Sequence, residues 1–288
     1  MNKAVAAMLE QYPRRSVDDH VNALREIFQN IALCGLWRGK FHEKGAFYGG
    51  TALRILHGLD RYSEDMDFSL MEPDPVFDLA PYCSFIEEEL GAWGFATSVT
   101  AKSKTVDSAI ESAFLKANTR EQFLVIEADP EIVESIHGTR RLKIKFEVDT
   151  DPPPGFRTET RFLLQPIPFS VRIYDPPSLF AGKMHALLCR SWKNRVKGRD
   201  WYDFVWYVGR GTELDLGHLG TRMRQSGHYD EEADLDEASF RRLLADKISG
   251  LDVADARSDV ERFIRERSTL EVWSQEFFSA VAERVVIL

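Results

Sequence analysis

Alternating apolar and charged residues predict several β-strands in the first part of the chain. Residues 140–150 (RRLKIKFEVDT) alternate cleanly, which is typical of a strand with one buried face. Residues 65–71 (DMDFSLM) follow the same pattern, and residues 46–50 (AFYGG) predict a short strand that ends in a tight turn. We also expect residues 95–103 and 109–117 to form an antiparallel hairpin.

Apolar residues at helical spacing predict helices between these strands. Residues 16–33 begin with Ser16 and carry Asp19 three positions later, as in a capping box, and their apolar residues then recur as on an amphipathic helix. Residues 51–59 and 80–94 have helical patterns too, and the second of these ends at a glycine. Residues 1–165 therefore predict an α+β core with a mixed sheet and an N-terminal packing helix.

The remainder of the chain, residues 166–288, predicts a helical domain. Two prolines open an apolar helix at residues 176–192, and a second apolar-faced helix follows at residues 198–210. Further helical patterns lie in the acidic region that begins near residue 212, at residues 237–251, 256–267 and 270–286. Since no long flexible linker separates the two halves, we expect them to pack tightly.

Composition narrows the class of protein. The chain has 288 residues, 44% of them hydrophobic, and is therefore long enough to bury a substantial core. Its formal net charge of -9 disfavours general nucleic-acid binding, so that any contact with nucleic acid requires a local basic patch. No apolar run reaches the ~18 residues of a membrane span. Because the N-terminus also lacks signal-peptide features, we expect a soluble cytoplasmic protein.

The cysteine pattern bears on disulfides and on metal binding. Cys34, Cys83 and Cys189 stand in apolar surroundings and have no CxxC spacing. Such an odd, scattered set argues against a disulfide framework and against a zinc site.

Two carboxylates stand out on the strand at residues 65–71. Asp65 and Asp67 share one face of this strand, and the apolar residues share the other. Neighbouring carboxylates repel each other, but a divalent cation that prefers oxygen ligands stabilises the pair. Without further context, ordinary surface acids on an exposed strand would be the better interpretation.

Two further features favour chemistry at this strand. The turn at residues 49–51 (GGT) opens a helix whose backbone N–H groups are suited to hold phosphate, although alone it would only indicate a tight turn. On the strand at residues 140–150, Glu147 and Asp149 share one face with two lysines. These charges either face solvent or supply the third oxygen ligand of a two-metal site.

In this order, the motifs resemble those of the AbiEii/AbiGii-type nucleotidyltransferase toxins, which include the MenT toxins and belong to the polymerase-β-like nucleotidyltransferase superfamily. The family reads GG-T-A-L and then R-x-S-x-D-x-D-F, and the matching positions are Gly49, Gly50, Thr51, Ala52, Leu53, Arg61, Ser63, Asp65, Asp67 and Phe68. In the second half, K-x-x-A-L-x-x-R and R-D-x-x-D match at Lys183, Ala186, Leu187, Arg190, Arg199, Asp200 and Asp203. The resemblance covers residues 15 to 208, and the combination is more specific than any single motif.

The resemblance implies a magnesium-dependent transfer of a nucleotide from an NTP, with release of pyrophosphate. Asp65 and Asp67 would hold two Mg²⁺ ions, with Glu147 as the third carboxylate and Asp149 as its alternate. The implied nucleotide-binding residues are Gly49, Gly50 and Thr51 around the phosphates, Ser63 in the following loop, Lys183 on the triphosphate, and Asp200 or Asp203 beside Lys183. The helical domain would complete this active site.

The family also implies a biological role. Its members suggest a toxin of a type IV-like toxin–antitoxin system, with a cognate antitoxin, that transfers nucleotides to the 3′ end of tRNA. The stretch from residue 181 to 199 has basic residues and no acid before Asp200, and is compatible with RNA binding through Arg190, Lys193, Arg195 and Lys197, or with a solvated helix end. The alternatives are transfer of NMP to a protein or small-molecule hydroxyl, and a non-catalytic NTP-binding regulator. The intact aspartate pair argues against the regulator.

Overall fold

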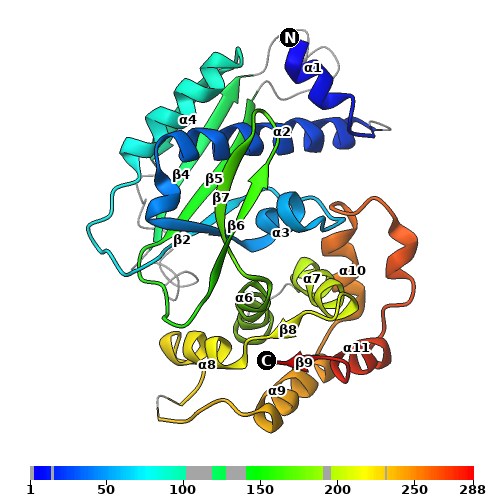
Figure 1. Cartoon of the computed structure of the whole chain (residues 1–288). Helices are drawn as coiled ribbons and strands as arrows, with labels where there is room; N and C mark the ends of the chain where they lie inside the picture. Colours follow the sequence, from blue (N-terminus) through cyan, green and yellow to red (C-terminus); the bar gives the residue numbers. More distant parts are fainter. Residues whose placement is uncertain (1–2, 14–15, 102–118, 128–140, 191–195, 231) are drawn as a thin grey trace. The chain divides into compact units, whose positions relative to one another are not determined.

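The computed structural model describes residues 3–13, 16–101, 119–127, 141–190, 196–230 and 232–288 (Figure 1). The chain forms two compact units that alternate along the sequence. The sheet unit comprises residues 1–57, 64–152 and 160–173, and the helical unit comprises residues 58–63, 153–159 and 174–288. Each unit buries apolar side chains of its own.

A mixed sheet of seven strands, in the order β3-β4-β5-β2-β1-β7-β6, forms the centre of the sheet unit. The strands are β1 (Gly45–Tyr48), β2 (Met66–Leu70), β3 (Ala96–Ala101), β4 (Thr119–Glu127), β5 (Arg141–Asp149), β6 (Thr158–Leu163) and β7 (Phe169–Tyr174). The pairs β2–β5 and β1–β7 are parallel, while β1–β2, β3–β4 and β4–β5 are antiparallel. This arrangement confirms the predicted α+β class and places β2 beside β5 within the sheet.

The helices of the sheet unit are α1 (Lys3–Leu9), α2 (Val17–Arg38), α3 (Gly49–His57) and α4 (Ala80–Ala92), with a short 3-10 turn, η1 (Phe41–Glu43). Helix α2 begins where predicted, because the Ser16 hydroxyl accepts a hydrogen bond from the Asp19 backbone N–H at 3.1 Å. Helices α2 and α4 pack against each other, and α2 crosses the strands of the sheet (Figure 1). Leu24 and Phe28 of α2 are fully buried in the resulting core.

Aromatic packing anchors β2 on its core face. Met66 and Phe68 are buried, as the alternation predicts. The Phe68 ring stacks against Phe47 of β1, with 5.0 Å between centroids, and against Phe146 of β5 at 6.2 Å. This packing fixes which face of β2 points into the core, and therefore turns Asp67 to the opposite face.

The helical unit contains α6 (Pro176–Cys189), α7 (Gly198–Gly209), α8 (Leu216–Gln225), α9 (Glu237–Ser249), α10 (Val253–Glu261), η3 (Arg267–Leu270), α11 (Gln275–Ala282) and a parallel pair, β8 (Glu213–Leu214) with β9 (Val286–Ile287). Helix α6 packs against α7, α8 and α9, and α7 packs against α10 and α11. The rings of Phe180 on α6 and Tyr207 on α7 stack at 4.5 Å between centroids. Loop 58–63 belongs to this unit, where the Tyr62 N–H donates to the Phe263 carbonyl at 2.8 Å.

Some observed elements differ from the predicted ones. Strand β3 pairs with β4, which has no counterpart among the predicted elements, and residues 109–117 lie outside the described residues. Strand β7 joins the sheet although it follows residue 165, and the division into domains at that residue stays a prediction. Helix α11 starts later than predicted because the Ser274 hydroxyl caps it, accepting the Phe277 N–H at 3.0 Å. Within the described ranges, no helix combines the length and hydropathy required to cross a membrane.

Candidate active site

The register of β2 and β5 places two predicted metal ligands side by side. Asp67 pairs with Glu147 across these parallel strands, and Ser69 pairs with Asp149. Side chains at paired positions point to the same face, and neighbouring strands lie about 4.8 Å apart. Asp65 comes directly before the first residue of β2. The sheet therefore brings Asp67 and Glu147 together, with Asp65 at the start of the same strand.

The two candidates for the third carboxylate have different surroundings. Glu147 Oε1 lies 2.5 Å from Lys145 Nζ, and each of these side chains is a little more than a quarter exposed. The Asp149 carboxylate accepts a hydrogen bond from the Asp151 backbone N–H at 3.1 Å, which orders the turn after β5. Asp149 thus has a local structural role, while Glu147 lies beside Asp67. The surroundings favour Glu147, and its role as a metal ligand stays a prediction.

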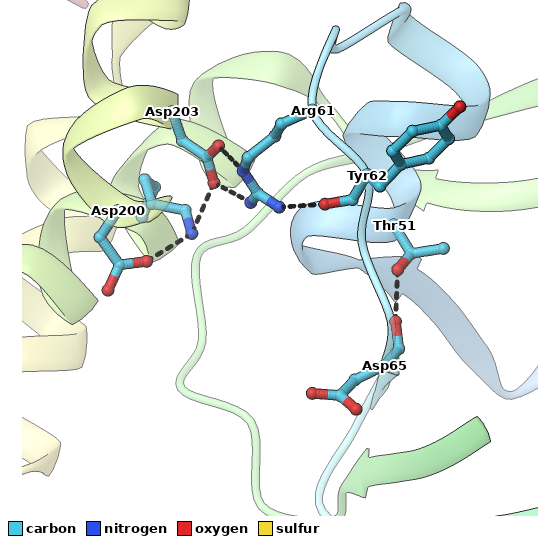
Figure 2. Close-up of polar contacts among 7 residues, drawn as sticks. Thr51, Arg61, Tyr62, Asp65, Asp200 and Asp203 are labelled. Carbon is cyan, nitrogen blue, oxygen red and sulfur yellow. Dashed lines mark hydrogen bonds and ion pairs between the residues drawn. The ribbon is translucent and has the colours of Figure 1, made fainter. Parts of the chain in front are cut away.

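The glycine turn packs directly against the Asp67 carboxylate. Gly49 begins α3 with a φ of +80°, a left-handed conformation that strains any residue with a Cβ. A Cβ added at Gly49 would overlap a carboxylate oxygen of Asp67 and lie 3.1 Å from the Asp67 Cβ. The side chain of Thr51 is buried, and its hydroxyl donates to the Asp65 backbone carbonyl (Figure 2). The turn that was predicted to hold phosphate therefore also positions both aspartates.

A buried ion-pair network links loop 58–63 to α6 and α7 in the helical unit (Figure 2). The Arg61 guanidinium donates from Nε to Asp203 Oδ1 at 2.6 Å and from Nη2 to Asp203 Oδ2 at 2.5 Å. Lys183 Nζ lies 2.8 Å from a carboxylate oxygen of Asp200 and 2.8 Å from one of Asp203. These side chains are 13% exposed or less, so the two cations and the two carboxylates neutralise each other with little help from water.

The network shifts the pKa values of Asp200, Lys183 and Arg61 toward their charged forms. Burial alone would raise the pKa of Asp200, but Lys183 and Arg190, together with the hydrogen bond from Lys183, lower it from 3.8 to about 2. Burial would lower the pKa of Lys183, yet the neighbouring Asp200 and Asp203 raise it overall. Burial would also lower the pKa of Arg61, but the charge and hydrogen bonds of Asp203, together with Asp200 and Tyr202, raise it overall. Arg61, Lys183 and Asp200 therefore stay charged at neutral pH.

The predicted basic stretch is only partly an exposed surface. Lys183 is held in the ion-pair network, and the Arg199 guanidinium lies 4.3 Å from the centroid of the Phe263 ring. Arg190 is exposed at the end of α6, and Lys197 directly precedes α7. The other two predicted RNA-binding residues, Lys193 and Arg195, lie outside the described residues.

Arg61 has a role that the sequence did not indicate. It matches a position of the family motif, but its partner Asp203 lies 142 residues away along the chain, so that only the fold brings them together. The one feature of the sequence that could have indicated this network is the spacing of Asp200 and Asp203, which puts both carboxylates on one face of a helix. Ser63 is half-buried in the same loop as Arg61, and its contact with phosphate stays a prediction.

The chain is similar to known proteins along most of its length. A family model described as nucleotidyl transferase AbiEii toxin, type IV TA system, matches residues 31–282. The crystal structure of JHP933 from Helicobacter pylori is similar, with a TM-score of 0.53 and 14% sequence identity, over 91% of this chain and 90% of that chain. A second structure from H. pylori, described as a putative nucleotidyltransferase, has a TM-score of 0.49 and 17% identity, over 90% of each chain. No curated protein matches the sequence.

The Gly49 conformation gives a first prediction. We expect Gly49→Ala to lower the free energy of unfolding by about 1–3 kcal/mol, because the added Cβ is strained at positive φ and collides with Asp67. Gly91→Ala is the matched control, since a Cβ at this helical glycine has nothing within 4 Å. It should leave stability unchanged or raise it by up to about 1 kcal/mol. Urea unfolding measures both, and equal stability of the two variants would refute the close approach.

The ion-pair network gives a second prediction, on acid stability. Because the folded-state pKa of Asp200 is lowered to about 2, its contribution is present above its ordinary pKa of 3.8 and is lost as the pH falls from about 4 to 2. We expect the stability advantage of the parent over Asp200→Asn to shrink in this range, by up to about 1.4 kcal/mol per pH unit. Exposed Asp246→Asn is the control and should show no such trend. A parent-to-Asp200→Asn difference that stays constant from pH 7 to pH 2 would contradict the assignment.

Proposed function

This chain belongs to the AbiEii nucleotidyl transferase toxin family of type IV toxin–antitoxin systems, and on that premise we propose that its sheet unit carries a magnesium-dependent centre for nucleotidyl transfer. The family match makes the chain a nucleotidyltransferase, as the motifs predicted. The observation that best supports the position of the centre is the pairing of Asp67 with Glu147 beside the Gly49 turn.

The residues at this position fit magnesium. Asp65, Asp67 and Glu147 offer carboxylate oxygens, which are the ligands that Mg²⁺ prefers, and Asp67 and Glu147 are neighbours on one face of the sheet. The Lys145 ammonium neutralises the charge of Glu147, and a nearby cation is expected where neighbouring carboxylates would otherwise repel each other. When bound, two Mg²⁺ ions would supply neutralisation of phosphoryl charge and activation of the acceptor hydroxyl.

The chain's own groups bind and orient the NTP in this proposal. The first N–H groups of α3 face the phosphates, and the two glycines leave room for the triphosphate to approach the backbone. Thr51 acts through its backbone N–H and by holding Asp65, since its hydroxyl is already bonded to the Asp65 carbonyl. The acceptor oxygen attacks the α-phosphorus, the bond to the pyrophosphate oxygen breaks, and pyrophosphate leaves.

Lys183 has two roles in the proposal. On the family resemblance it contacts the triphosphate as a point charge. Its ammonium is also paired with Asp200 and Asp203, so that a triphosphate would have to compete with two carboxylates for it. These pairs join α6 to α7, and we therefore expect Lys183 to contribute to stability as well as to NTP binding.

We further propose that the acceptor is the 3′ end of a tRNA, which places the reaction in the cytoplasm, and that a cognate antitoxin opposes it. The proposal rests on the family and on the basic residues Arg190, Lys193, Arg195 and Lys197 in a chain of net charge -9. Transfer of NMP to a protein or to a small molecule is the competing outcome, and the same labelling experiment distinguishes the acceptors.

The carboxylate assignment gives the main prediction. With an NTP labelled at the α-phosphate, Mg²⁺ and total cell RNA or protein, the parent should release pyrophosphate and label RNA. Asp67→Asn should lose at least about a hundredfold in rate, since catalysis here depends on charge neutralisation. It should keep its fold by circular dichroism, because Asp67 lies on the face of β2 away from the core. Asp246→Asn, at an exposed position on α9, should behave as the parent. Full activity of Asp67→Asn would exclude the metal assignment, and label in protein alone would exclude the RNA acceptor.

The basic residues give a separate prediction on RNA binding. Combined substitution of Lys193, Arg195 and Lys197 by Ala should weaken tRNA binding and flatten its salt dependence, by about 0.7 in slope for each phosphate that the variant no longer neutralises. The control removes the same charge from exposed residues elsewhere, with Lys44, Arg242 and Arg284 changed to Ala. If the two triple variants bind tRNA alike at every salt concentration, these residues do not contact the acceptor.

A further inference from the structure

Three metal-binding side chains meet in the helical unit, on residues that the proposed transfer centre does not use. His185, Cys189 and His228 each offer one ligand atom, and these atoms all lie within 4.8 Å of one another. His185 and Cys189 are four positions apart on α6, so they project from the same face of the helix. His228 comes from the turn after α8, the helix that packs against α6.

The backbone around His228 holds this ligand in place. Gly227 lies two residues after the end of α8 and has a φ of +69°, and its N–H donates to the Arg224 carbonyl at 2.9 Å. The His228 N–H reaches back to the Met223 carbonyl at 2.8 Å. These two bonds form a Schellman motif, which fixes the residue that follows the glycine. All three ligands are therefore carried by ordered backbone.

Ser226 lies between the two histidines of the group. Its hydroxyl oxygen lies 2.8 Å from His185 Nε2 and 3.0 Å from His228 Nδ1. One small hydroxyl thus spans the gap between the two imidazoles, which have an interplanar angle of 90°. An ion that binds all three ligands would replace these contacts, and the Ser226 hydroxyl also donates to the Met223 carbonyl at 3.2 Å.

The donor set selects the kind of ion. Two imidazole nitrogens and one thiolate sulfur suit Zn²⁺, whereas Mg²⁺ and Ca²⁺ require oxygen ligands. Three protein ligands leave the fourth tetrahedral position open to water or to another ligand. We propose that His185, Cys189 and His228 form a three-ligand site for Zn²⁺, separate from the carboxylates of β2 and β5.

The protonation states are compatible with binding. Burial, with Arg222 and Arg190 nearby, lowers the pKa of His185 to about 3, so the imidazole is neutral and able to coordinate. Burial raises the pKa of Cys189 to about 11, although Lys247 and Arg222 act in the opposite direction. Zinc binding therefore has to displace the thiol proton to solvent. The nearby cations favour the thiolate but repel the metal, which limits affinity.

The spacing of these ligands along the chain does not indicate a zinc site. An isolated cysteine and two histidines far apart in the chain match no familiar zinc motif, which is why the cysteine pattern argued against zinc. The helix spacing of His185 and Cys189 is visible in the sequence, but the third ligand is supplied by the turn after α8. That turn becomes a neighbour of α6 only in the folded unit.

Cobalt(II) titration of the full-length chain, after treatment with a chelator, tests the site. We expect Co²⁺ to produce a sulfur-to-cobalt charge-transfer band at one ion per chain, and Zn²⁺ to abolish the band while excess Mg²⁺ does not. Asp67→Asn should keep the band, so that failure of the transfer centre and failure of this site are distinguishable.

Two variants and a matched control decide the ligands. Cys189→Ser should lose the band, while Cys83→Ser, which removes another buried free cysteine, should keep it. His228→Ala should weaken Co²⁺ binding at least tenfold, and because His228 is exposed this variant decides the question if Cys189→Ser does not fold. Absence of the band in the parent, or its persistence at unchanged affinity in His228→Ala, would overturn the proposal.

Discussion

The parallel register between β2 and β5 is the constraint on which the proposed centre depends. Phe68 is held between Phe47 and Phe146 on the core face, and this packing turns Asp67 and Glu147 to the opposite face as neighbours. A slip of one residue would exchange the faces and bury a carboxylate. The same arrangement leaves no room for a side chain at Gly49. The packing of the core on one face of β2 therefore also determines where the carboxylates lie on the other face.

The helical unit buries charged side chains of both signs. Two cations and two carboxylates are buried together, and the bidentate contact between Arg61 and Asp203 uses both oxygens of a fully buried carboxylate. Such a network adds little net stability compared with apolar packing, but removing one member typically costs about 3–5 kcal/mol. The network instead fixes the positions of its members. It holds Arg61, which lies four positions before Asp65 in the sequence, and it joins α6 to α7 through Lys183.

Local patterns predicted the parts of this protein that depend on local physics. The strands that carry Asp67 and Glu147 alternate clearly because one face of each is buried, and Ser16 caps its helix as expected. The sequence did not predict strands β4 and β7. Strand β4 pairs with β5 and β7 pairs with β1, so both depend on partners elsewhere in the chain. The register that favours Glu147 over Asp149, the Arg61–Asp203 pair and the meeting of His185 with His228 also depend on contacts between distant segments. Sequence motifs identified most of the candidate site residues, but only the structure shows which residues lie next to them.

The most direct test of the proposed centre compares two carboxylates on the same strand. Glu147 pairs with Asp67, whereas Asp149 pairs with Ser69 and bonds to the turn at Asp151. The rate of NTP-dependent labelling should be measured against Mg²⁺ concentration for Glu147→Gln and Asp149→Asn. We predict that Glu147→Gln loses transfer at every Mg²⁺ concentration while Asp149→Asn retains it. Retention of transfer by Glu147→Gln, with its loss in Asp149→Asn, would contradict the centre derived from the strand register.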